Sequence, residues 1–137
     1  HCAAPDRLPG TLSFHILKNA RHINMIQISP DQLQAWFAGQ ENAAQAMVLD
    51  VRETHEFATA SPKPTAAYEL VQMPMAGIPA RLDELDKSRP IACLCHHGAR
   101  SYQVAMFLEN MGYGCVANIS GGIDAWSQQI DPSVPRY

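Results

Sequence analysis

The stretch CHHGARS, residues 95–101, carries residues that could form a reactive thiol site. Cys95 ends a predicted apolar strand, and a helix is predicted to begin near Ser101. Unpaired N–H groups at a helix N-terminus stabilise a negative charge, and Arg100 adds a positive one. Gly98 allows the connecting loop to curl so that its amides point inward. We therefore expect Cys95 to be an ionised nucleophile at neutral pH, beneath an anion-binding loop.

The loop after the cysteine is the expected binding site for the charged group of a substrate. We expect Cys95 to be the catalytic residue and the substrate-binding residues to be His96, His97, Gly98, Ala99 and Arg100. Arg100 and the loop amides would neutralise charge on the substrate as a bond breaks. A histidine can be charged or neutral near pH 7, so either histidine could contact the substrate or move a proton. The sequence does not decide which of the two faces the pocket.

The other cysteines of this chain have simpler interpretations than a role in catalysis. Cys93 lies two residues before Cys95 on the same strand, so core packing is favoured over a resolving role, and a disulfide between the two would be strained. Cys115 is also expected in the core. The cluster of Cys93, Cys95, His96 and His97 lacks the two spaced ligand pairs of a structural zinc site. We therefore expect no metal and no organic cofactor.

Five apolar runs predict five strands, with helical patterns between them. The strands are expected at residues 25–29, 46–51, 68–74, 91–95 and 115–120, and the helices at 29–40, near 53, at 78–86, at 101–111 and at 121–130. Strict alternation of this kind predicts an α/β fold with a central five-stranded parallel sheet and helices on both faces. Active sites in such sheets lie at the carboxyl ends of the strands, where Cys95 is placed.

Cap and turn residues support this assignment of elements. Ser29, Pro30 and Gln32 form the N-cap, first position and capping box of a helix. Gly121 and Gly122 are expected to form a turn in which two backbone segments approach closely.

A charged pair follows the second predicted strand. Asp50 lies at a carboxyl end of the sheet, which would allow a catalytic role. The favoured interpretation is a structural ion pair of Arg52 with Asp50, Glu53 or Glu56 that fastens the strand to the next helix.

At 137 residues, with 47% hydrophobic and 17% charged residues, the chain has the length and composition of one folded domain. Its net charge of −3 argues against a nucleic-acid partner, which would usually require a basic surface. No apolar run approaches the roughly 20 residues that span a bilayer, so no membrane span is expected. Four cysteines are too few for a disulfide framework, which favours reduced thiols and a cytoplasmic location.

The chain divides near residue 25. Residues 1–24 show neither clear periodicity nor the pattern of a signal peptide. We expect them to be a vector-derived segment or a loosely attached extension, with a processed leader as a further alternative. Met25 is a plausible native start, so residues 25–137 are expected to form the domain.

Three motifs in this order resemble the single-domain rhodanese family of sulfurtransferases. They are LDVRE at residues 49–53, Cys-x-x-Gly-x-Arg-Ser at 95–101 and GGIDAW at 121–126. The resemblance implies a rhodanese-like α/β fold with a central five-stranded parallel sheet. It also implies that Cys95 carries sulfane sulfur as a persulfide, from thiosulfate or a similar donor to a thiol or cyanide acceptor. The amides of residues 96–100 would hold that persulfide.

Two other functions use a loop of this kind. A sulfur-carrier or regulatory module of the same family would pass the Cys95 persulfide only to a protein acceptor. Rhodanese-fold phosphatases and related arsenate reductases carry five residues between cysteine and arginine, whereas this chain has four between Cys95 and Arg100, which favours sulfur over phosphate.

Residues 59–68 differ from the usual family sequence. In the family this loop commonly packs near the mouth of the active site, so the difference affects which acceptor is expected and the shape of the pocket.

Overall fold

Five parallel strands form the sheet of this protein in a computed structural model that describes residues 25–137. The strands are β1 (Ile26–Ile28), β2 (Met47–Asp50), β3 (Glu69–Gln72), β4 (Ile91–Leu94) and β5 (Val116–Ile119). Their order is β1-β5-β4-β2-β3, and every neighbouring pair is parallel. The predicted parallel sheet is confirmed, and β4, the strand before Cys95, lies at its centre.

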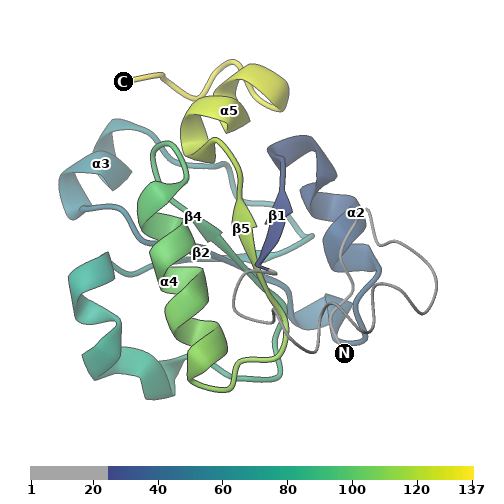
Figure 1. Cartoon of the computed structure of the whole chain (residues 1–137). Helices are drawn as coiled ribbons and strands as arrows, with labels where there is room; N and C mark the ends of the chain where they lie inside the picture. Colours follow the sequence, from purple (N-terminus) through teal and green to yellow (C-terminus); the bar gives the residue numbers. More distant parts are fainter. Residues whose placement is uncertain (1–24) are drawn as a thin grey trace.

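Helices cover both faces of the sheet, as predicted. The α-helices are α2 (Leu33–Ala38), α3 (Thr54–Thr59), α4 (Ala99–Asn110) and α5 (Gly122–Gln129), and shorter 3₁₀ segments are η2 (Pro30–Gln32), η3 (Ala43–Gln45), η4 (Met75–Gly77) and η5 (Pro79–Glu84). Figure 1 shows α4 crossing one face of the sheet. There Val104 and Leu108 of α4 belong to one core cluster with Leu49 of β2. On the other face Trp36 of α2 and Trp126 of α5 belong to a second core.

The prediction of an α-helix at residues 78–86 is wrong. The chain forms two 3₁₀ segments there, and Arg81 departs from helical geometry with φ −114° and ψ 17°. The hydroxyl of Tyr113 lies 2.8 Å from the Leu82 carbonyl oxygen and 2.7 Å from that of Leu85, so it competes with helical hydrogen bonds. Ile78 and Leu85 still reach the core, as the apolar pattern indicated.

The helix after Cys95 begins earlier than predicted. Gly98 adopts a left-handed conformation with φ 111° and acts as the N-cap, so α4 starts at Ala99 rather than near Ser101. The predicted capping box at Ser29 and Gln32 is present, although the segment begins as a 3₁₀ turn before it becomes α2.

A fully buried ion pair fastens the end of β2 to α3, and it confirms the structural interpretation of Arg52. The guanidinium donates to both carboxylate oxygens of Asp50, at 2.8 and 2.6 Å, and both side chains are 0% exposed. It also donates to the backbone carbonyls of Glu56 (3.2 Å) and Ala60 (2.8 Å). Glu56 lies within α3 and Ala60 is its C-cap, so one side chain connects the strand to the helix.

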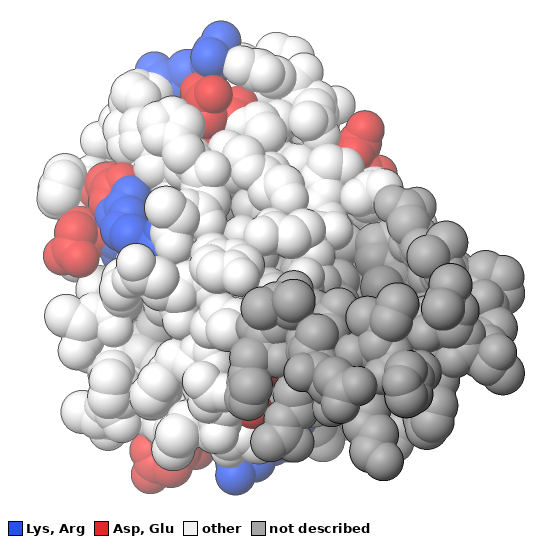
Figure 2. Space-filling model, in the orientation of Figure 1, with Lys and Arg blue, Asp and Glu red and all other residues white. Residues whose placement is uncertain are grey.

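On the surface, charges of opposite sign lie beside one another. Figure 2 shows groups of Lys and Arg atoms next to Asp and Glu atoms on the face that α4 covers. A wide area without charged residues separates these groups from one another. Among residues 25–137, no helix is long and apolar enough to cross a bilayer. The prediction that residues 1–24 are an extension lies outside the described residues.

The burial of the Arg52 pair gives a first prediction. Arg52→Leu should lower the free energy of unfolding by about 3–5 kcal/mol, because it leaves the Asp50 carboxylate buried without its partner. Urea unfolding would measure this loss. Arg81→Leu, which removes an exposed pair with Glu84, is the control and should change stability little. The double variant Asp50→Leu/Arg52→Leu should regain part of the loss; equal instability of single and double variants would contradict the explanation.

Candidate active site

The sulfur of Cys95 lies at the carboxyl end of the central strand, within hydrogen-bonding distance of two donors. The backbone N–H of Gly98 donates to it at 3.0 Å, and the hydroxyl of Ser101 lies 3.3 Å away. Cys95 is 1% exposed, so the sulfur lies at the base of the loop rather than on the surface. Donors of this kind stabilise a thiolate, which is the reactive form of a cysteine.

The start of α5 fixes the direction in which the loop amides point. The N–H of Ile123 donates to the Cys95 carbonyl at 2.8 Å, and that of Asp124 donates to the His96 carbonyl at 3.1 Å. Because a trans peptide places its C=O and N–H on opposite sides, the N–H groups of His96 and His97 point away from α5. The N-terminus of α5 thus binds the loop carbonyls on one side, and the loop N–H groups on the other side are directed to where an anion could bind.

Gly122 makes this close contact possible, as the sequence predicted for the glycine pair. Its φ is +60°, and a Cβ built there would lie 2.4 Å from the carbonyl oxygens of both Cys95 and His96. Only glycine can therefore bring α5 this close to the loop.

Arg100, predicted to bind an anion, is held by Glu56 of α3. Two guanidinium nitrogens donate to the two carboxylate oxygens at 2.6 and 2.9 Å, and the Arg100 side chain remains 35% exposed. The hydrogen bonds from Arg100 hold the pKa of Glu56 well below its usual range, and the same contact raises the pKa of Arg100. The Glu53 N–H and the Tyr137 hydroxyl donate to the same carboxylate.

The two loop histidines differ in exposure. His97 is exposed and stacks on the half-buried His96, whose other face is covered by the ring of Tyr137; both stacks have a centroid distance of 3.9 Å. The Nε2 atom of His96 is buried without a hydrogen-bond partner among the described residues. Burial, followed by the charge of His97, lowers the pKa of His96. The neutral form of His96 is therefore favoured.

The loop is joined to β5 by a buried polar network that the sequence reasoning missed. Ser101 lies within hydrogen-bonding distance of Cys95 and of Asn118, and Asn118 continues to Gln27 of β1. A signal for it was present, because Asn118 is a polar residue within the apolar strand VANI. Tyr137, which covers His96, carried no such signal.

The structure gathers the predicted residues 95–100 around one turn, although Ala99 is exposed on the first turn of α4. Among residues 25–137, no group of three His, Cys, Asp or Glu side chains is placed to hold a metal ion. Cys93 is fully buried, as expected, and burial strongly raises the pKa of its thiol.

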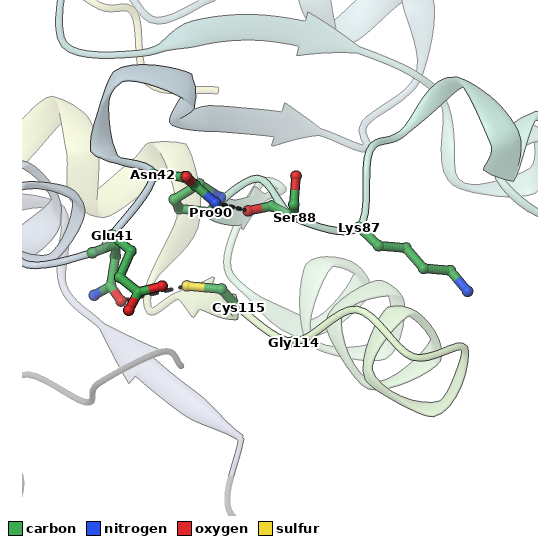
Figure 3. A pocket seen from close by; sticks show the side chains of 8 residues that line it. Glu41, Asn42, Lys87, Ser88, Pro90, Gly114 and Cys115 are labelled. Atoms are coloured by element: carbon green, nitrogen blue, oxygen red, sulfur yellow. Dashed lines mark hydrogen bonds between the residues drawn. The ribbon is translucent and has the colours of Figure 1, made fainter.

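Cys115, expected in the core, is half-buried and packs against the edge of the core that contains Trp36 and Trp126. It lies at the opposite end of the sheet, before β5, in a pocket of about 150 Å³, and its sulfur is 3.5 Å from Gln40 Oε1. Figure 3 shows that Lys87, the one cation lining this pocket, extends away from the cysteine. The loop at Cys95 is therefore the stronger candidate for chemistry.

Comparisons with known proteins agree with this site. A family model described as a rhodanese-like domain matches residues 29–129. A protein named sulfurtransferase from Allochromatium vinosum is 34% identical over 108 residues, which cover 79% of this chain and 94% of that protein. The thiosulfate sulfurtransferase GlpE of Actinobacillus pleuropneumoniae is 31% identical over 111 residues, covering 81% of this chain and 94% of that protein.

The fold has solved counterparts as well. The crystal structure of a rhodanese-like domain protein from Staphylococcus aureus matches with a TM-score of 0.62 and 25% identity, over 81% of this chain and 97% of that one.

The contact at Gly122 gives a prediction for the site. Gly122→Ala should lower the free energy of unfolding by about 1–3 kcal/mol, because the methyl group must displace the loop carbonyls and φ is positive. It should also change the rate at which iodoacetamide alkylates Cys95. Gly77→Ala is the control, since no atom lies within 4 Å of a Cβ there. Equal effects of the two substitutions would refute the close contact.

The lowered pKa of Glu56 makes stability depend on acid pH. Its charged form is favoured in the folded protein, so this stabilisation is present above the ordinary carboxyl pKa of about 4.3 and is lost as the pH falls. Glu56→Gln should reduce the free energy of unfolding by about 1–3 kcal/mol at pH 7 and flatten its decline below pH 4. Urea titrations from pH 7 to pH 2 would test this, with exposed Glu41→Gln as the control. A parallel decline in both variants would contradict it.

Proposed function

This chain belongs to the rhodanese-like family and is a sulfurtransferase, and we propose that it moves sulfane sulfur through a persulfide on Cys95. The proposed donor is thiosulfate or a similar anion, and the acceptor is a thiol or cyanide. One observation supports the role of Cys95 most directly. Its sulfur accepts from Gly98 N–H and lies beside the Ser101 hydroxyl at the end of the central strand.

In the first step the Cys95 thiolate attacks the outer sulfur of the donor. With thiosulfate, a bond forms between Sγ and that sulfur, the S–S bond of the donor breaks, and sulfite leaves with the electron pair. The N–H groups of His96 and His97 would bind the sulfonate oxygens. Glu56 accepts from two of the guanidinium N–H groups of Arg100, so other N–H groups of its five can reach the donor.

In the second step an acceptor removes the sulfur. The Cys95 persulfide anion left by the first step takes a proton from water. A thiolate acceptor then attacks its outer sulfur and becomes a protonated persulfide itself, and Cys95 leaves as a thiolate. Cyanide would leave as thiocyanate and release the proton. The donor product departs before the acceptor reacts, so the steady-state kinetics should be ping-pong.

The test is the intact mass of the reduced protein before and after incubation with thiosulfate. Wild type should gain one sulfur atom and lose it on addition of cyanide, and Cys95→Ser should gain none. Cys115→Ser is the matched control and should behave as wild type, because that thiol lies at the other end of the sheet.

Two outcomes would count against the proposal. A sulfur gain that persists in Cys95→Ser would assign the persulfide to another cysteine. No gain from thiosulfate would exclude this donor, and a persulfide that only a protein removes would exclude the small-molecule acceptors.

A further inference from the structure

Two polar side chains are buried directly behind the reactive sulfur. Ser101 of α4 is 0% exposed, and Asn118 of β5 is 2% exposed. Their surroundings are apolar, since Asn118 is in register with Cys93 of β4, and Cys93 shares a core cluster with Val104 and Ala105 of α4. Burying a polar group is unfavourable unless it is hydrogen-bonded, so each contact of this pair can be followed to its partner.

The orientation of the Asn118 amide is fixed by two acceptors. Its Nδ2 atom donates to the Gly98 carbonyl at 3.1 Å and to Gln27 Oε1 at 2.9 Å. A backbone carbonyl can only accept, so the nitrogen must face Gly98 and the oxygen must face Ser101. Asn118 Oδ1 lies 2.5 Å from the Ser101 hydroxyl oxygen and acts there as a fixed acceptor.

The single hydroxyl proton of Ser101 therefore has two competing acceptors. Asn118 Oδ1 is at 2.5 Å and Cys95 Sγ at 3.3 Å. The Gly98 carbonyl is also near, at 3.2 Å, but it already accepts from Asn118 and from the backbone N–H of Tyr102. The charge on the sulfur then decides the direction of the proton, because a charged acceptor makes the stronger hydrogen bond.

We propose that Asn118 is a positioning residue that holds the Ser101 hydroxyl beside Cys95 Sγ and accepts its proton until this sulfur becomes negative. The inference rests on the proposed persulfide cycle. In the persulfide the Sγ atom carries no charge, and the hydroxyl donates to Asn118. When an acceptor thiolate takes the outer sulfur, the electron pair of the broken bond stays on Sγ and the hydroxyl rotates to it.

The two half-reactions should therefore respond differently. Discharge of the persulfide creates charge on Sγ, so a hydrogen bond that forms there stabilises the transition state. Formation of the persulfide removes charge from Sγ, so the same bond stabilises the starting thiolate and gives no acceleration at high pH. Loss of the Ser101 donor should slow discharge selectively.

The experiment compares wild type, Ser101→Ala, Asn118→Leu and the double variant. Each protein is loaded with inorganic polysulfide, and the loss of sulfur to dithiothreitol is followed by quenched intact-mass measurement. In parallel, the rate of alkylation of the unloaded proteins by iodoacetamide is measured against pH, with Cys95→Ser as background. Asn110→Leu, an exposed asparagine at the far end of α4, is the matched control.

Ser101→Ala should slow discharge by about ten- to a hundredfold and raise the pH of half-maximal alkylation by about one unit, as for a lost hydrogen bond to a charged group. Asn118→Leu should shift both quantities in the opposite direction by a smaller factor, because it removes the acceptor that competes with Cys95 Sγ for the Ser101 proton. If Asn118 acts through Ser101, Asn118→Leu should add nothing in the Ser101→Ala background. Asn110→Leu should match wild type.

The alkylation profile separates this inference from the proposed function. If no protein accepts sulfur, the persulfide cycle fails, while the alkylation shifts still test the contact of Asn118 and Ser101 with Cys95. If the rate factors of the two single variants multiply in the double variant, the two residues act independently and the inference is overturned. So would an Asn118→Leu variant that melts earlier with an unchanged alkylation profile. If Asn118→Leu does not fold, Asn118→Ala removes the same amide without added bulk.

Discussion

The near-complete burial of the Cys95 sulfur is the constraint on which the rest of this structure depends. A thiolate at the base of the loop requires hydrogen-bond donors, and the backbone of the Gly98 turn and the Ser101 hydroxyl supply them. Those donors stay in place because α5 binds the loop carbonyls from behind. The parallel sheet brings the ends of β4 and β5 together, so the loop and the first turn of α5 meet at its centre.

The arginines near this site are already paired with carboxylates. Arg52 binds Asp50, Arg100 binds Glu56, and Arg136 binds Asp124 at the start of α5. These charges cancel locally, so under the proposed function a donor anion would interact mainly with peptide dipoles and with the outer N–H groups of Arg100. Such dipoles are fixed by the fold and need no rearrangement when charge develops. The ion pairs hold the surrounding helices in position.

Sequence reasoning succeeded where the type of a residue determines the structure of its own segment. The apolar run before Cys95 and the alternation of elements predicted the sheet and the place of Cys95 at the carboxyl end of its central strand, and the family resemblance is confirmed. It failed where contacts depend on packing between distant segments. The pairing of Arg100 with Glu56 joins two helices, and the apolar spacing at residues 78–86 fits a 3₁₀ path as well as an α-helix.

The burial of Cys93 has a consequence for oxidative damage. If peroxide converts Cys95 to a sulfenic acid, recovery requires a second thiol that can form a disulfide with it. Cys93 is fully buried with a raised pKa, and Cys115 lies at the other end of the sheet. Among residues 25–137 there is thus no internal thiol suited to this repair. An oxidised Cys95 would depend on external reductants such as glutathione, and without them it would proceed to irreversible sulfinic acid.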